Sequence, residues 1–291
     1  MKLRWITLLL LGVMGALLAL SEQAGQAVRQ GLSLCAGSVI PSLFPFFVLS
    51  SLFTSLGGGA MLWRLPFFSR QGSTIFFLGA LGGYPLGGRL IGQLVRSGGL
   101  EQQEAQKLLC CCNNAGPAFI LGLVGLGRFG SLRVGLGLYL IHVAAALLLA
   151  LALRPGGAGC TASLPPATQE TSLAGALVDA IAAAGATMVQ ICAFVVFFVT
   201  ALSLLQPLPP FQLPLVRGLL ELTNGVTGLE NTPAGFVQGA FLLGWGGISV
   251  HCQTAAVLEG TGLSMGRYML AKGVQGLLSA LLAAPIAGCL F

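Results

Sequence analysis

Two glycine-rich polar patches interrupt the apolar sequence of this chain, and their residue types could bind a small anion. The first patch is Gly-Gly-Tyr-Pro-Leu-Gly-Gly-Arg at residues 82–89, followed by Asn-Asn-Ala-Gly-Pro at residues 113–117. The second is Gly-Gly-Ile-Ser-Val-His-Cys-Gln at residues 246–253. Lipid penalises unpaired backbone groups, so such sequence persists at membrane depth only where protein or water surrounds it. Two such patches are typical of the two halves of a transport site.

The first patch combines a tight turn with polar side chains. Gly83 permits a sharp turn with close backbone approach, and Pro85 fixes it. Tyr84 offers a ring face and a hydroxyl group, and Arg89 can pair with an anion through its fork of donors. The alternative is a helix–helix contact between small residues. That alternative leaves Arg89 unexplained.

Asn113 and Asn114 lie between a polar helix and an apolar one. A single asparagine would be enough to cap the second helix, whose first turn would contain Pro117. A helix N-terminus with amide side chains can also bind a carboxylate or phosphate. We therefore predict that both asparagines contact the substrate, with capping as the alternative.

Ser249, His251 and Gln253 alternate along the second patch. They would share one face on an unwound stretch but not on a regular helix. His251 could couple proton movement, or it could be an interior histidine with satisfied hydrogen bonds. A Ser–His hydrolase is disfavoured because no nucleophile elbow is present and no carboxylate is close in sequence. We expect no enzyme activity.

Two further polar features lie outside these patches, at Glu221 and His142. Glu221 and the following Thr223–Gly225 stretch could line a cavity opposite the second patch or cap a helix at the interface. His142 lies on an apolar helix and is expected to be structural. The eight cysteines are expected to be structural thiols, so neither a metal nor another cofactor is predicted.

Composition indicates that these patches lie in an integral membrane protein. The 291 residues are 55% hydrophobic and 8% charged, with a mean hydropathy of +0.90. A soluble chain carries roughly 25% charged residues. The net charge of +6 does not indicate nucleic-acid binding, because the basic residues are scattered among the connections. The apolar run at residues 5–20 is expected to be a retained first helix rather than a cleaved signal peptide.

The elements that position the patches are expected to be helices, since no alternating strand pattern appears. We predict an all-α polytopic membrane protein with about 8 transmembrane or re-entrant helical segments. Pro41 and Pro45 are expected to interrupt the second segment, and residues 173–205 to be tilted or broken. The apolar segments are residues 3–20, 32–56, 74–95, 114–126, 132–153, 173–205, 215–229, 234–258 and 268–290, with a polar helix at 101–112.

The two sides of the Pro/Gly-rich stretch at residues 154–172 resemble each other. Each contains a small-residue helix that ends in an aromatic cluster, and each continues to a Gly-Gly patch. This similarity suggests a duplication. The two halves are inverted relative to each other if one of the segments 74–95 and 114–126 is re-entrant, and we favour this arrangement. The positions of Arg128 and Arg133 instead fit a topology in which both segments cross the membrane, so the relative orientation of the halves stays open.

Several short motifs, in this order, resemble the YlbJ (SpoVV) family of sporulation integral membrane proteins. The motifs are Phe-Pro-Phe-Phe-Val at 44–48, Gly-Tyr-Pro-x-Gly at 83–87, Glu-Ala at 104–105, Asn-Asn-x-Gly-Pro at 113–117 and Ser-Val-His-x-Gln at 249–253. The resemblance covers residue 28 to the end. That group belongs to the nucleoside-recognition (gate) domain family, whose fold is similar to the core of concentrative nucleoside transporters.

The resemblance implies a multi-pass protein that moves dipicolinate, a small aromatic dicarboxylate, across the outer forespore membrane. It also implies a transporter-like core of two gate-like repeats, at 28–153 and 173–291, joined by the linker at 154–172. The apolar run at residues 5–20 predicts a transmembrane helix within 1–27 that precedes this core. The alternative is a non-transporting assembly factor of the spore cortex or envelope. Expected partners are the anion, the lipid bilayer and either a second copy or other sporulation membrane proteins, with no nucleic acid. The predicted ligands are Gly83, Tyr84, Arg89, Asn113, Asn114, Ser249, His251 and Gln253.

Overall fold

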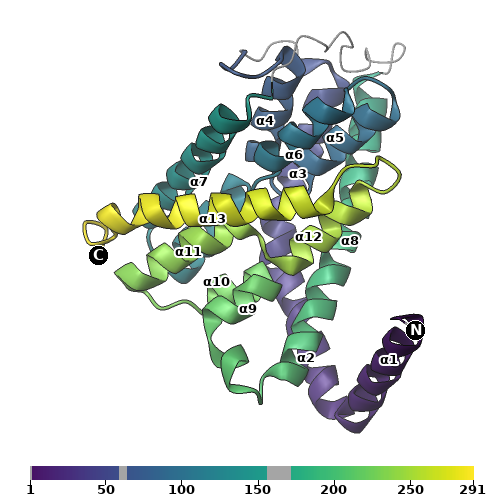
Figure 1. The fold of residues 1–291 in the computed structure, drawn as a ribbon, viewed down its shortest axis with the longest axis vertical. Coiled ribbons are helices and arrows are strands. Elements are labelled where there is room, and N and C mark those ends of the chain that lie inside the picture. The colour runs from purple at the N-terminus through teal and green to yellow at the C-terminus, as the bar shows by residue number, and fades with distance from the viewer. Residues whose placement is uncertain (1, 59–63, 156–171) are drawn as a thin grey trace.

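The computed structural model describes residues 2–58, 64–155 and 172–291, and within these ranges every regular element is helical. Most of the predicted linker at 154–172 lies outside the described residues. The first helix, α1 (Lys2–Ala19), stands apart from the other helices (Figure 1). The next helix, α2 (Ser21–Leu34), follows after a bend at Leu20, so the predicted boundary after residue 27 lies inside α2.

Within the described ranges, four helical stretches are long and apolar enough to cross a membrane. They expose large apolar side chains along their length, as on Val189 and Leu281, which are 73% and 70% exposed. Such long uncharged faces are what a bilayer solvates. The four stretches are Ser21–Ser55, Leu132–Leu153, Leu173–Leu205 and Met265–Ala287.

The first of these stretches is continuous, although an interruption at its prolines was predicted. It runs through α2, a π-helical turn η1 (Cys35–Val39) and α3 (Ile40–Ser55). The π turn is closed by the Ile40 N–H, which donates to Cys35 O. A widened turn lets the chain remain helical next to a residue that cannot donate, so Pro41 lies in the first turn of α3 without ending the helix.

The rest of the first half consists of two broken helices and one long helix. The first broken helix is α4 (Arg70–Gly82) and α5 (Leu86–Arg96), interrupted at residues 83–85. The second is α6 (Gln102–Cys112) and the π-helix η3 (Ala118–Arg128), interrupted at 113–116. The long helix α7 (Leu132–Leu153) ends at Arg154, which has a left-handed conformation and precedes Pro155.

The second half repeats this order. It begins with α8 (Leu173–Leu205), which is unbroken, and the 3-10 turn η4 (Pro209–Gln212). A short broken pair follows, α9 (Pro214–Leu220) and α10 (Leu222–Thr227), interrupted at Glu221. A second broken pair, α11 (Pro233–Trp245) and α12 (Gly247–Val257), precedes the long helix α13 (Met265–Ala287).

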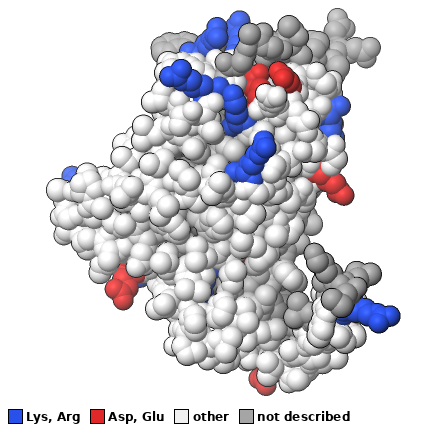
Figure 2. Space-filling view, viewed as in Figure 1, with Lys and Arg blue, Asp and Glu red and all other residues white. Residues whose placement is uncertain are grey.

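The last helix holds the two halves together. In Figure 1, α13 crosses the body between α4–α6 above it and α9–α12 below it, and it packs against α6, α7 and α11. The two longest helical stretches, α2–α3 and α8, pack against each other. The face in Figure 2 is largely uncharged, and most of its Lys and Arg atoms gather at the upper end, in the region of α4–α6.

Candidate functional site

The two Gly-Gly patches form the tips of two broken helices, and these tips touch. Tyr84, between α4 and α5, donates a hydrogen bond of 3.2 Å to the carbonyl oxygen of Leu243 near the end of α11. Gly246 has a φ of 90°, and an added Cβ there would lie 3.2 Å from the Tyr84 hydroxyl. Both the left-handed conformation and the close approach therefore require glycine at this tip.

Each tip also lies against another helix break in its own half. An added Cβ at Gly83 would lie 3.0 Å from the backbone nitrogen of Gly116, in the unwound stretch between α6 and η3. An added Cβ at Gly247 would lie 3.1 Å from the backbone nitrogen of Leu222, beside the Glu221 break. Four helix interruptions from the two halves thus meet in the interior.

A cavity of about 50 Å³ lies where the four interruptions meet. Its apolar wall includes Phe119 from η3 and Ile191 from α8. A cavity of this volume has room for a few waters. The polar side chains that line it come from three of the breaks: Tyr84, Glu221, Thr223, Ser249 and Gln253.

The residues of the second patch separate onto two faces because α12 is a regular helix. Ser249 and Gln253 are four residues apart and both line the cavity. His251 does not line it. Its ring lies edge-on to Trp245 and Tyr268, with centroid distances of 4.4 and 5.3 Å. The structure therefore brings Ser249 and Gln253 together and places His251 in an aromatic environment.

The side chain of Asn113 ties three helices together. Its amide nitrogen donates to the hydroxyl groups of Thr254 (3.0 Å) and Tyr268 (2.9 Å). Its side-chain oxygen accepts from the backbone N–H of Gly88, at 3.2 Å. Asn113 thereby connects the α6–η3 break to α5, α12 and α13, and every polar atom of its amide has a partner.

Next to Asn113, Lys272 of α13 is completely buried. Its ammonium donates to Asn113 O (2.8 Å) and Gln275 Oε1 (2.6 Å) and lies 3.4 Å from Asn114 Oδ1. Gln275 donates in turn to Asn114 Oδ1, at 3.0 Å. The ammonium also lies 5.3 Å from the centroid of the Tyr84 ring, whose face attracts cations. A basic side chain from the second half thus lies directly behind a residue that lines the cavity.

Lys272 and Gln275 were absent from the predicted site. The available signal was a polar stripe, Lys272, Gln275 and Ser279, at helical spacing in an otherwise apolar span. Such a stripe marks the face that a membrane helix turns toward other protein. His142 belongs to the same interior network, since its Nε2 accepts from Ala115 N at 3.1 Å, and this agrees with the structural role expected for it.

Glu221 both caps a helix and lines the cavity, the two alternatives that the sequence left open. Its carboxylate accepts from the backbone N–H groups of Thr223 (3.1 Å) and Asn224 (2.6 Å) and so caps α10. The same side chain is buried and lines the cavity.

Arg89 points away from the cavity. Its guanidinium donates to Thr187 Oγ1 of α8 at 2.7 Å, and Ala183 O lies 3.5 Å away. We expect a double-mutant cycle of Arg89→Ala and Thr187→Val to give a coupling of about 1 kcal/mol, the usual contribution of one hydrogen bond. Thermal unfolding in detergent would measure it. Additive effects would contradict this tie between α5 and α8 and leave Arg89 free for another ligand.

Comparison with known proteins gives one curated relative. The chain is 27% identical over 310 residues to the sporulation integral membrane protein YlbJ of Bacillus subtilis (strain 168), and the match covers 88% of this chain and 75% of the relative. Neither a protein-family model nor a solved structure matches the chain. Together with the four apolar helices, this relative supports a membrane location. The similarity along most of the chain supports its assignment to the YlbJ family of sporulation integral membrane proteins.

Proposed function

We propose that this protein is a multi-pass secondary transporter or facilitator of a small organic anion. The proposed substrate is dipicolinate, and the proposed location is the outer forespore membrane. The observation that carries the proposal is the meeting of four helix interruptions around one small cavity that polar side chains help to line. Interrupted helices expose backbone donors and acceptors, and membrane proteins tolerate such backbone where it surrounds a substrate path.

The order of elements supports a core of two repeats. Each half contains a long helix, two broken pairs and a second long helix, in that order. By this order, the break at Gly83 corresponds to the break at Glu221, and the break at Asn113 corresponds to the one at Gly246. The Gly-Gly sequences alone would instead pair the break at Gly83 with the break at Gly246. Two such halves that rock against each other would expose the cavity to alternate sides.

The cavity is smaller than a site for the proposed substrate needs to be. Small-molecule sites usually measure roughly 300–1,000 Å³. An aromatic dicarboxylate would therefore enter the cavity of about 50 Å³ only after the tips at Tyr84 and Gly246 have separated. The separation would break the hydrogen bond between Tyr84 and Leu243, which contributes about 1 kcal/mol.

We propose that the cavity residues contact the anion first. Ser249 Oγ is buried without a hydrogen-bond partner, and Gln253 makes no side-chain hydrogen bond to another described residue, so both have donors available. Lys272, Asn113 and Asn114 lie behind Tyr84, and their donors would reach the anion only by exchanging their present partners when the tips part. Gly83, Arg89 and His251 do not line the cavity but are close in sequence to residues that do. We propose that they contact the anion in an open state.

The proposal is tested by dipicolinate uptake into proteoliposomes that contain the purified protein. We expect Ser249→Ala/Gln253→Ala to lower the initial rate roughly 10- to 30-fold, since two neutral hydrogen bonds contribute about 1 kcal/mol each. Ser279→Ala is the matched control, because Ser279 Oγ is also buried without a partner but lies on α13 and does not line the cavity. The control should transport at the wild-type rate.

Each other outcome has a definite meaning. Saturable uptake that both variants retain would support transport but refute the cavity as its site. If the folded wild-type protein shows no uptake, with or without a pH gradient, transport of dipicolinate is refuted. The assembly-factor function would then be preferred, because the hydrogen bonds of Asn113 are all satisfied within the protein, as expected for a rigid scaffold.

A further inference from the structure

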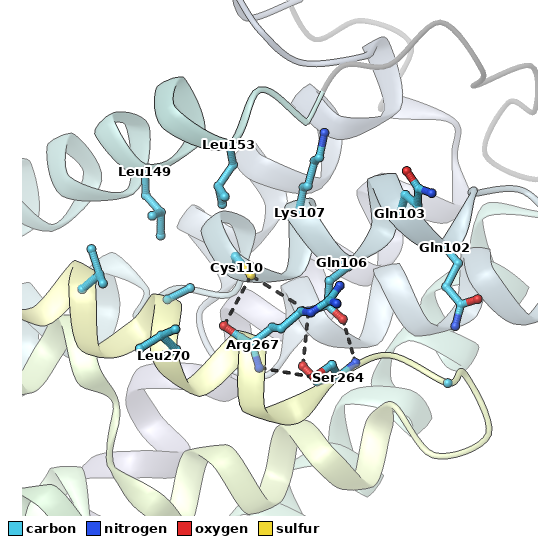
Figure 3. A pocket seen from close by; sticks show the side chains of 13 residues that line it. Gln102, Gln103, Gln106, Lys107, Cys110, Leu149, Leu153, Ser264, Arg267 and Leu270 are labelled. Atoms are coloured by element: carbon cyan, nitrogen blue, oxygen red, sulfur yellow. Dashed lines mark hydrogen bonds between the residues drawn. The ribbon is translucent and has the colours of Figure 1, made fainter.

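A second and larger hollow lies between α6, α7 and α13, separate from the cavity of the helix breaks. Its volume is about 790 Å³. Figure 3 shows Leu149 and Leu153 of α7 on one side, the glutamines of α6 on the other, and Arg267 between α6 and α13. The hollow therefore has an apolar side and a polar side that carries positive charge.

The two cations of this groove are available to a ligand. Lys107 and Arg267 are both exposed, and neither side chain forms a hydrogen bond or ion pair with another described residue. Among the described residues, no aspartate or glutamate lines the groove. The neighbouring Gln106 is held in place, since its side chain accepts from Ser264 N (2.6 Å) and donates to Ser264 O (3.2 Å).

The apolar side of the groove is formed by the ends of two of the long apolar helices. Leu153 is the last residue of α7, and Arg267 lies in the first turn of α13. Leu270 and Val274 continue from Arg267 along α13 and are 73% and 40% exposed. A ligand that contacts both ends of the groove must be anionic at one end and apolar along the next turns of α13.

We propose that this groove binds one anionic phospholipid of the surrounding bilayer. The headgroup phosphate would be held by Lys107 and Arg267, and one acyl chain would lie along Leu149, Leu270 and Val274. Basic pockets between membrane helices recognise anionic headgroups, and each basic residue near the surface contributes about 1 kcal/mol. A soluble anion would use only the cations and leave the apolar side of the groove exposed. The inference does not depend on the transport proposal.

The test uses the full-length protein, delipidated in a neutral detergent, with added dioleoyl phosphatidylglycerol. Native mass spectrometry counts the bound lipid, and thermal unfolding reports its stabilising effect. We expect phosphatidylglycerol to bind in preference to phosphatidylcholine, and Lys107→Gln/Arg267→Gln to weaken its binding roughly 10- to 30-fold, as two such contacts would predict. Arg133→Gln, at the opposite end of α7, removes an exposed cation elsewhere and should leave binding unchanged.

Three results would overturn the proposal. The first is equal binding of phosphatidylglycerol and phosphatidylcholine, which would reduce the groove to a general apolar contact. The second is undiminished phosphatidylglycerol binding by the double variant. The third is stabilisation by inorganic phosphate or dipicolinate without stabilisation by the lipid, which would make the groove an anion vestibule.

Discussion

Replacing Lys272 by methionine is expected to lower the free energy of unfolding by about 3 kcal/mol, because the substitution leaves a buried hydrogen-bonding network without its central donor. Asn113 O and Gln275 Oε1 would lose bonds of 2.8 and 2.6 Å in an interior that offers no replacement. Methionine fills similar space, so the loss reports mainly the unsatisfied oxygens. Reversible unfolding in detergent, followed by circular dichroism, would measure it.

Lys107→Met is the control for this variant, since it removes a lysine of the same size from an exposed position on α6. In phosphatidylglycerol-free detergent it should change stability by less than about 0.5 kcal/mol. The double variant Lys272→Met/Gln275→Leu should be more stable than Lys272→Met alone, because it also removes an acceptor that has lost its donor. If Lys272→Met and Lys107→Met unfold at the same temperature, the network does not hold the breaks together.

Gly87→Ala is expected to destabilise the protein by about 3 kcal/mol, at the upper end of the range for added methyl groups in a packed interior. The added methyl would overlap the carbonyl oxygen of Cys112, and one at Gly79 would overlap the same atom. This obstacle is backbone next to the Asn113 break, so it cannot rotate away as a side chain can. Thermal unfolding and the retained fraction after detergent extraction would both report the effect.

Gly122→Ala provides the comparison, since nothing lies within 4 Å of a Cβ at Gly122 of η3. There the gain in helix propensity should leave stability unchanged or raise it by a few tenths of a kcal/mol. Equal stability of Gly87→Ala and the wild type would show that α5 and the end of α6 can separate, contrary to the close contact described here.

The apolar runs were enough to predict most helices, because length and hydropathy dominate in lipid. The helix predicted at 132–153 has those bounds in the structure, and the stretch at 173–205 is a single unbroken helix. The segment predicted at 234–258 as one span is broken at Gly246, where two glycines in succession adopt positive φ. Hydropathy averages over such a break and so cannot locate it.

The site was predictable only where local sequence determines it. The glycine patches identified the helix tips, but the partners of each side chain depend on which distant helix packs there. Arg89 meets Thr187, and Lys272 meets Asn113, across separations of 98 and 159 residues. The faces of Ser249 and His251 were decided by whether α12 forms a regular turn, which the Gly-Gly pair at its start left open.

The contact between Lys272 and Asn113 also sets an order of events during biosynthesis. Asn113 is synthesised 159 residues before the lysine that completes its hydrogen bonds. At a translation rate of about 5–20 residues per second, the carbonyl of Asn113 lacks this donor for roughly 10–30 s. We therefore expect the Asn113 carbonyl, in the break between α6 and η3, to bind water or to contact the insertion machinery until α13 is inserted. A ribosome that stalls before α13 would release a chain that quality-control proteases can recognise.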